Sequence, residues 1–298
     1  MFRPRTDLAM EAKEIFNRST GSASALEGVV ASDYEICGCS VSKVKIMNAK
    51  GEKALGKPTG TYTTITVPAH EIPTPHSGAA AALSHELRDM LPQGNGTILV
   101  AALGNPNITP DAIGPLAAEG IFATRHLVHD IPAAFGRLRP VAVISTDVLG
   151  STGIESAEII AAACGSVSPD AVIIVDALAA AELSRVCCTV QISDSGIVPG
   201  SGVGNNRRAV NRETLGVPVI AVGVPTVVDA ASLAAQLAGR AGYSNVSSDN
   251  IRRSTEPMIV TPREIDKQVR QLARTVSHGI NAALHPSLDA AEIAAAMS

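Results

Sequence analysis

The 298-residue sequence contains no tryptophan, and aromatic residues make up only 2% of it. Unstacked nucleic-acid bases usually bind on aromatic rings, and a formal net charge of −4 gives no electrostatic attraction for phosphates. We therefore expect no direct binding of nucleic acid. Hydrophobic residues nevertheless account for 46% of the chain, so small aliphatic side chains can build a large core.

Long apolar runs are also missing. No uncharged apolar segment approaches the roughly 20 residues that a membrane-spanning helix needs. Charged residues near the N-terminus, among them Arg3, Arg5 and Asp7, interrupt the apolar core that a signal peptide would require. We expect a cytoplasmic protein that does not contact a membrane.

Cysteine is scarce, and its five positions are unevenly spaced. The spacing fits neither a disulfide framework nor paired zinc ligands, which indicates free thiols. None of the seven histidines lies in a His-Glu-x-x-His arrangement, and no serine lies in a Gly-x-Ser-x-Gly turn. Common zinc-peptidase and serine-hydrolase patterns are therefore absent.

Short apolar runs alternate with alanine-rich segments after residue 96, a pattern typical of repeated β-α units. This predicts an α/β fold whose mostly parallel sheet has helices on both faces. The expected strands are residues 97–103, 141–145, 171–175, 189–192 and 217–222. The expected helices are residues 77–90, 111–124, 156–163, 177–185, 227–239 and 261–284.

The N-terminal region has a different pattern. Residues 1–25 are charged and then small and polar, which predicts a mobile arm outside the core. Threonine, valine and tyrosine are concentrated in residues 34–47 and 59–67, which predicts a small antiparallel β element ahead of the main sheet. In the last helix, Thr261, Pro262 and Glu264 suggest an N-cap, a first-turn proline and a capping-box acid.

Two aspartates follow apolar strands, where open parallel sheets usually bind ligands. Asp111 comes after the strand at 97–103, in a helical turn opened by Thr109 and Pro110, where free N–H groups favour an ionised acid. Asp176 ends the apolar run at 171–175, where an unpaired charge is costly to bury. We interpret Asp176 as functional, whereas Asp111 taken alone fits a helix-stabilising acid equally well.

Together, the two acids can perform acid–base chemistry. If Asp111 and Asp176 meet in one crevice, they cannot both ionise cheaply, so the pair shares a proton. One carboxylate can then activate water while the other protonates a leaving group. This is the chemistry of peptide-bond hydrolysis by an acid pair.

A glycine-rich connection at residues 194–208 is longer than compact domains usually leave without structure, which indicates a binding segment. We expect Gly200, Gly202 and Gly204 to contact substrate, with Arg207 and Arg208 pairing with an acidic residue of a bound peptide. The spacing is a weak match to a dinucleotide-binding loop. Asp147 and Glu155 also follow a strand, but fit helix-capping acids better.

Several segments together closely resemble the germination protease family of endospore-forming bacteria. The resemblance extends from the arm to the last helix. It rests on residues 5–12, 109–115, 175–178, 192–196, 200–205 and 225–230. Two departures are a very short stretch before Thr6 and a shortened segment between Ala230 and Thr261.

The resemblance implies an aspartic endopeptidase, made as a zymogen, that degrades small acid-soluble spore proteins during germination. It places the two catalytic aspartates at Asp111 and Asp176, and it implies a homotetramer in the forespore or spore core. Residues 6–11 are similar to the sites that this family cuts. We therefore expect residues 1–7 to be a propeptide removed at the Asp7–Leu8 bond, and residues 8–298 to be a single α/β protease domain.

Two other functions stay open. One is a metal-dependent endopeptidase of the hydrogenase-maturation type. That family is distantly similar to the germination proteases and binds nickel through two acids and a later histidine. No histidine lies between His129 and His278, so we expect no metal and no other cofactor. The other is a non-catalytic α/β module that holds an anion through the backbone of residues 200–204.

Overall fold

The computed structural model describes residues 6–20, 26–68, 71–204, 207–243, 248–254 and 256–297. Its strands are β1 (Val29–Ile36), β2 (Cys39–Ile46), β3 (Gly60–Thr66), β4 (Ile98–Leu103), β5 (Val141–Asp147), β6 (Ala171–Ala180), β7 (Thr189–Ser193), β8 (Val219–Asp229) and β9 (Ile259–Val260). Its α-helices are α1 (Ala9–Thr20), α2 (Ala49–Leu55), α3 (Gly78–Met90), α4 (Ile113–Ala118), α5 (Arg125–Asp130), α6 (Pro132–Phe135), α7 (Leu149–Thr152), α8 (Ser156–Val167), α9 (Arg212–Leu215), α10 (Ala230–Arg240), α11 (Ser248–Ser254), α12 (Ile265–Leu284) and α13 (Ala290–Met297). Three short 3₁₀ turns are η1 (Thr109–Asp111), η2 (Leu183–Arg185) and η3 (Ser201–Val203).

The strands form one mixed sheet in the order β1-β2-β3-β7-β8-β6-β4-β5, and β9 pairs with β8 beside this path. The strands β8, β6, β4 and β5 are parallel. The strands β1, β2, β3 and β7 are antiparallel to their neighbours, and β7 joins them to β8. The predicted α/β class is confirmed, and the predicted antiparallel element is continuous with the main sheet rather than separate from it.

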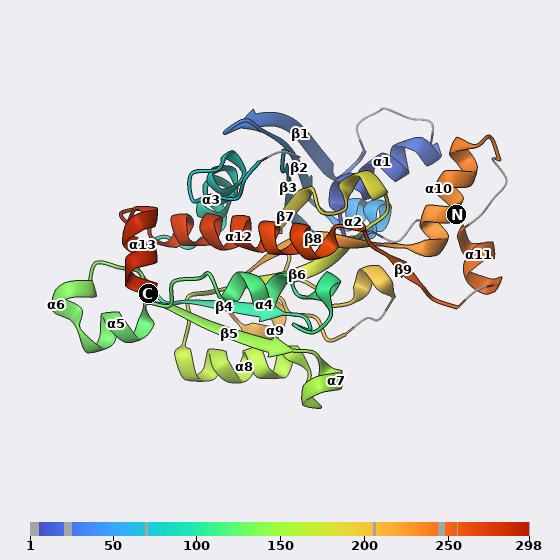
Figure 1. Ribbon diagram of the computed structural model, residues 1–298. Helices are drawn as coiled ribbons and strands as arrows, with labels where there is room; N and C mark the ends of the chain where they lie inside the picture. The colour runs from blue at the N-terminus through green and yellow to red at the C-terminus, as the bar shows by residue number, and fades with distance from the viewer. Residues whose placement is uncertain are drawn as a thin grey trace.

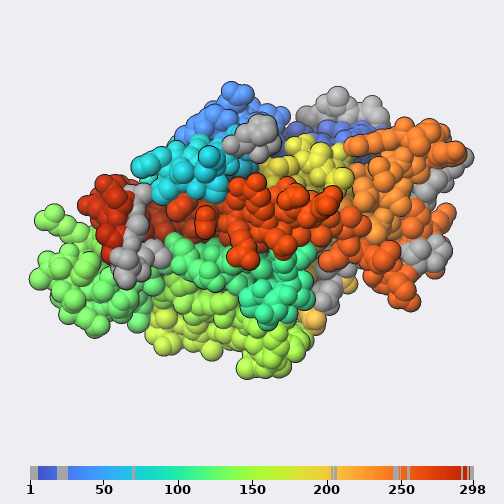
Figure 2. All heavy atoms as spheres, in the orientation of Figure 1, coloured from blue at the N-terminus to red at the C-terminus, as the bar shows by residue number. Residues whose placement is uncertain are grey.

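Helices cover both faces of the sheet, and α12 crosses one face between α3 and α4 (Figures 1 and 2). Alternate residues of β4 face the two cores, as the period of two in a strand requires. Ile98 and Val100 face the larger core, whereas Leu99 and Ala101 face the smaller core together with Ile160 of α8. None of the helices in the described residues combines the length and apolar character that crossing a bilayer requires.

Two predictions about the middle of the chain are wrong. The predicted helix at 177–185 is instead the continuation of β6 to Ala180 followed by η2, because this alanine-rich stretch pairs with β8. Long-range pairing thus outweighs local helix propensity. The strand at 189–192 runs antiparallel to β8 rather than parallel to it. A parallel strand would need a crossover helix after β6 to bring the chain back to the other end of the sheet, and only the short η2 lies there.

The predicted mobile arm is also wrong over its described part. Residues 1–5 and 21–25 lie outside the described residues. Between them, α1 packs against the body of the protein, and Leu8 and Ala9 are completely buried in the main core. The apolar residues at positions 8, 9, 10 and 12 supply the surface that fixes this helix.

The ends of the other helices differ from the predicted ones. The predicted helix at 111–124 is η1 followed by the short α4, and the helix at 227–239 begins only at Ala230, because β8 continues to Asp229. The last helix ends at Leu284 as predicted but begins at Ile265. Thr261 does not cap it, because its hydroxyl donates to the carbonyl of Thr226.

Candidate active site

Asp176 lies within β6 rather than beyond its end, which corrects the predicted position. The pairing of β4 with β6 ends at Ala102 and Val175. One residue further on, Asp176 pairs with Gly223 of β8. At Asp176, β6 is therefore paired with β8 on one side but no longer with β4 on the other. The Asp176 side chain lines a cavity at this point.

Asp111 reaches the same place from the loop after β4. The chain turns at Gly104, whose φ of +110° favours glycine, and the N–H of Asn105 donates to the Asp111 carboxylate at 2.7 Å. Asp111 ends η1 and so precedes α4, instead of opening it as predicted. A side chain on Gly114 would lie 2.7 Å from the carbonyl oxygen of Val175, so glycine lets this segment sit directly on the end of β4 and on β6.

The pKa of both carboxyl groups is raised. Burial raises the pKa of Asp111, partly offset by the hydrogen bond from Asn105, and the charge of Asp147 adds to the rise. For Asp176, burial raises the pKa well above its usual value, and the negative charge of Asp111 raises it further. Within the part of the chain that the structure describes, neither carboxylate has an ion pair with a basic side chain.

The two aspartates line a single cavity of about 310 Å³. Four of the five residues that we expected to contact substrate line it as well: Gly200, Gly202, Arg207 and Arg208. Gly204 is not among the lining residues. Arg208 also lies 3.8 Å from Glu158, so this arginine already has an acidic neighbour on α8.

Asp147 and Glu155 also line this cavity, so the sequence interpretation gave them too little weight. Asp147 has a φ of +56°, a left-handed conformation that aspartate tolerates better than most residues, and its carboxylate accepts the N–H of Val148 at 2.7 Å. Its charge acts on Asp111. Its position after a strand is visible in the sequence, but the pairing of that strand, β5, with β4 is not.

The arm enters the cavity as well. Asp7, one of the two residues of the predicted cleavage site, lines it together with Asp111 and Asp176, and its charge contributes to the raised pKa of Asp176. Leu8, on the other side of that bond, is completely buried. The sequence interpretation missed two residues that hold the arm here, Gln191 and Ser201.

The donor set around the aspartates is made of oxygen atoms. Among the described residues, no group of three or more histidine, cysteine, aspartate or glutamate side chains is arranged to hold a metal ion. All five cysteines are free, as predicted.

The structure thus defines an α/β protein with a mixed sheet and with two acids of raised pKa that line one cavity. The sequence model of germination proteases matches residues 9–238. The chain belongs to the germination protease family, and it is a peptidase of that family.

Relatives extend the match to nearly the whole chain. Germination protease from Clostridium tetani is 40% identical over 97% of this chain and 98% of its own length. Germination protease from Caldanaerobacter subterraneus is 39% identical over 97% of this chain and 96% of its own length. The Bacillus cereus protein is 34% identical, with 96% and 94% covered.

A solved structure of a hydrogenase maturation protease from Thermococcus kodakarensis is also similar. It is 15% identical in sequence and has a TM-score of 0.36. The match covers 98% of that protein and 65% of this chain. A likeness at that TM-score bears on neither the mechanism nor the metal content of this protein.

Proposed function

We propose that this peptidase is an aspartic-type endopeptidase that cuts small acid-soluble spore proteins at the start of germination. The observation that carries the proposal is the convergence of Asp111 and Asp176, both with raised pKa values and no basic partner, on one cavity. A buried acid pair of this kind is costly for a structural purpose and well suited to moving protons.

In the proposed mechanism the two acids share one proton. We assign the proton to Asp176 because it is the more deeply buried, whereas Asp111 accepts the Asn105 N–H, which favours its ionised form. Asp111 takes a proton from water as the water oxygen attacks the peptide carbonyl carbon. Asp176 gives its proton to the carbonyl oxygen, which forms a tetrahedral intermediate with two hydroxyl groups. Asp111 then passes the proton that it took from water to the amide nitrogen as the carbon–nitrogen bond breaks, and one hydroxyl of the intermediate returns a proton to Asp176 as the new carboxylic acid forms.

The biological setting follows from family membership. The relatives are named germination proteases, and we propose that this protein likewise acts in the spore core, as a homotetramer. We further propose that it is made as a zymogen that removes its own residues 1–7. The position of Asp7 supports this, because the residue before the predicted cut lines the same cavity as the acid pair.

Acid pH should favour self-cleavage. The form that bears one proton is depleted as pH rises above the upper of the two coupled pKa values, and it is restored as pH falls toward that value. Mass analysis of the intact protein after incubation at pH 5.5 and pH 7.5 tests this. The wild type should lose residues 1–7 faster at the lower pH, and Asp176→Asn should keep them.

The substrate proposal has a separate test. Purified small acid-soluble spore protein should be cut into defined fragments by the wild type and left intact by Asp111→Asn. Equal cleavage by both proteins would contradict the acid-pair mechanism. Intact spore protein with the active wild type, alongside cleavage of other acidic peptides, would contradict the substrate.

A further inference from the structure

The described part of the arm crosses the sheet as a bound peptide. The N–H of Asp7 donates to the carbonyl of Ala179 in β6 at 2.9 Å. On the other side, Gln191 of β7 uses both ends of its side-chain amide. Its Nε2 donates to the carbonyl oxygen of Asp7 at 2.9 Å, and its Oε1 accepts the N–H of Ala9 at 2.8 Å. One glutamine thus brackets the Asp7–Leu8 bond.

Gln191 stands in register with one of the acids. It pairs with Gly223 of β8, and Gly223 pairs on its other side with Asp176. Residues aligned in one row across a sheet project from the same face. A side chain on Gly223 would lie 2.3 Å from the Leu178 side chain, so the glycine leaves room for Leu178 to pack over it on this sheet.

Two neighbouring cavities meet at the arm. Asp111 and Asp176 line the first, whereas Gln191 lines a second cavity of about 250 Å³. Asp7 and Leu178 line both. Asp7, the residue whose carbonyl must be attacked in the proposed cleavage, is therefore shared by the cavity of the glutamine and the cavity of the acids.

The Asp7 carboxylate has its own binding site. It accepts the N–H of Ala179 at 2.9 Å and the hydroxyl of Ser201, from η3, at 2.8 Å. Gly202 provides the room, because a Cβ on it would lie 2.0 Å from the carboxylate oxygen. Two donors and a close glycine form a cradle shaped for an acid.

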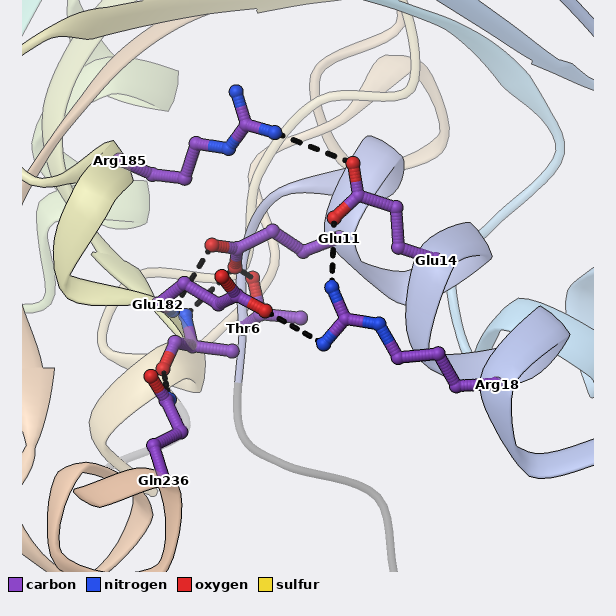
Figure 3. Close-up of polar contacts among 8 residues, drawn as sticks. Thr6, Glu11, Glu14, Arg18, Glu182, Arg185 and Gln236 are labelled. Carbon is purple, nitrogen blue, oxygen red and sulfur yellow. Dashed lines mark hydrogen bonds and ion pairs between the residues drawn. The ribbon is translucent and has the colours of Figure 1, made fainter. Parts of the chain in front are cut away.

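The segment after the cut is held by separate contacts (Figure 3). Glu11 accepts the N–H groups of Ala181 and Glu182 at 2.7 and 3.0 Å, as well as the hydroxyl of Thr6. Arg18 pairs with Glu182 at 2.8 Å. These contacts involve neither Ser201 nor Gln191, and Gln191→Glu keeps the acceptor for the Ala9 N–H, so α1 should stay in place when either residue is changed.

We propose that Ser201 and Gln191 are the specificity and positioning residues for the peptide bond that is cut. Ser201, with the N–H of Ala179, selects an acidic residue immediately before the bond, and Gln191 holds and polarises the carbonyl of that residue. This inference rests on the proposed self-cleavage at Asp7–Leu8. It adds Ser201 and Gln191 to the recognition that we expect from Arg207 and Arg208.

The test of Ser201 is a double-mutant cycle on the intact chain, followed as the first-order loss of residues 1–7 by mass analysis. Ser201→Ala should slow cleavage about tenfold, because it removes a hydrogen bond to a charged group. In a chain that also carries Asp7→Ala, the serine substitution should change the rate less than twofold. An equal slowing with and without the Asp7 carboxylate would overturn the assignment.

The test of Gln191 uses Gln191→Glu, which keeps the shape and the acceptor but loses the donor near neutral pH. Cleavage should slow about a hundredfold, as when one donor to a reacting carbonyl is lost. The deficit relative to wild type should shrink at acid pH, where the introduced carboxyl is protonated and can donate again. A deficit that stays constant across pH would reduce Gln191 to a structural role and overturn its part of the proposal.

Ser195→Ala is the matched control, because Ser195 hydrogen-bonds to Ser193 rather than to the arm. It should cleave at the wild-type rate, and thermal unfolding should verify that each variant is folded. If the wild type itself never cuts at Asp7–Leu8, the proposed self-cleavage fails and this inference fails with it. If the wild type cuts and the variants match it, only this inference fails.

Discussion

Two aspartates on the neighbouring strands β6 and β8 are buried to nearly the same extent but have opposite surroundings. Asp176 is 6% exposed and Asp229 is 8% exposed. Asp229 accepts hydrogen bonds from Ser232 at 2.9 Å and from Arg252 at 2.5 Å. Asp176 accepts only the N–H of its neighbour Ala177, at 2.9 Å, among the hydrogen bonds that the structure gives it.

The pKa values follow these surroundings. Burial pushes the pKa of Asp229 up, but the hydrogen bonds from Arg252 and Ser232 outweigh it, and the pKa is lowered. At Asp176, burial and the charge of Asp111 act in the same direction, and the pKa is raised. Asp229, which caps α10, is paired with a cation and stays ionised. Asp176, which lines the cavity, has no cation among the described residues and can exchange a proton at a pH where Asp229 cannot.

The largest expected effect comes from removing the unpaired acid. Asp176→Asn should lower peptidase activity by about 10²- to 10⁴-fold, the range for loss of general acid–base catalysis. It should leave the protein at least as stable at neutral pH, because Asp176 must take up a proton to be buried there, whereas an amide is already neutral. Activity against an acidic peptide and urea unfolding measure the two effects.

Asp229→Asn is the matched control on the other strand, and it should give the reverse result, with activity largely kept and stability lost. Comparable loss of activity in both variants would mean that the difference between the paired and the unpaired acid has no catalytic meaning.

The sequence predicted the strands that carry the acids better than it predicted how the acids are held. Asp176 was identified because the apolar strand that carries it is visible in the local sequence. The strands β4, β5 and β8 were predicted from the same kind of apolar run. The role of Asp229 depends on Arg252, 23 residues away, and on a helix that begins three residues later than predicted. Gln191 gave no signal, because its place beside the arm depends on the antiparallel course of β7. Contacts between distant segments decide such features.

The second effect is on stability. Arg252→Leu should leave the Asp229 carboxylate buried without its cation and lower the free energy of unfolding by about 2 kcal/mol. Urea unfolding at pH 7 measures this. An unchanged midpoint and slope would show that the pair is too solvated to contribute.

Stability against pH separates the two acids by sign. Because the folded pKa of Asp229 is lowered, its contribution is present above the usual aspartate pKa of about 4 and is lost as pH falls. Because the folded pKa of Asp176 is raised, its contribution is present below about pH 4 and is lost as pH rises. Asp229→Asn and Asp176→Asn should therefore change the pH slope of stability in opposite directions.

A smaller effect is expected from the exposed cations at the rim of the cavity. Replacing both Arg207 and Arg208 by alanine should raise KM for acidic peptides several-fold, with kcat and stability nearly unchanged, because ion pairs of exposed side chains are weak. Steady-state kinetics with an acidic peptide and its neutral analogue tests this. An unchanged kcat/KM would show that the two arginines do not help to recognise the acidic residue of the peptide, which would then be recognised by Ser201.

The smallest expected effect is that of a chelator. If a metal ion bound to Asp111 and Asp176, its charge would balance the two carboxylates. These acids would then resemble Asp229, which is paired with a cation. The side chains of the cavity wall that could bind a metal carry only oxygen donors, and no histidine lies between His129 and His278 in the sequence. We therefore expect dialysis against EDTA to leave peptidase activity within twofold of the untreated protein. Nickel or zinc added afterwards should not increase it. Loss of activity in the chelator, with recovery on adding one of these ions to the wild type and not to Asp111→Asn, would show that a metal balances the acids and that the shared-proton mechanism is wrong.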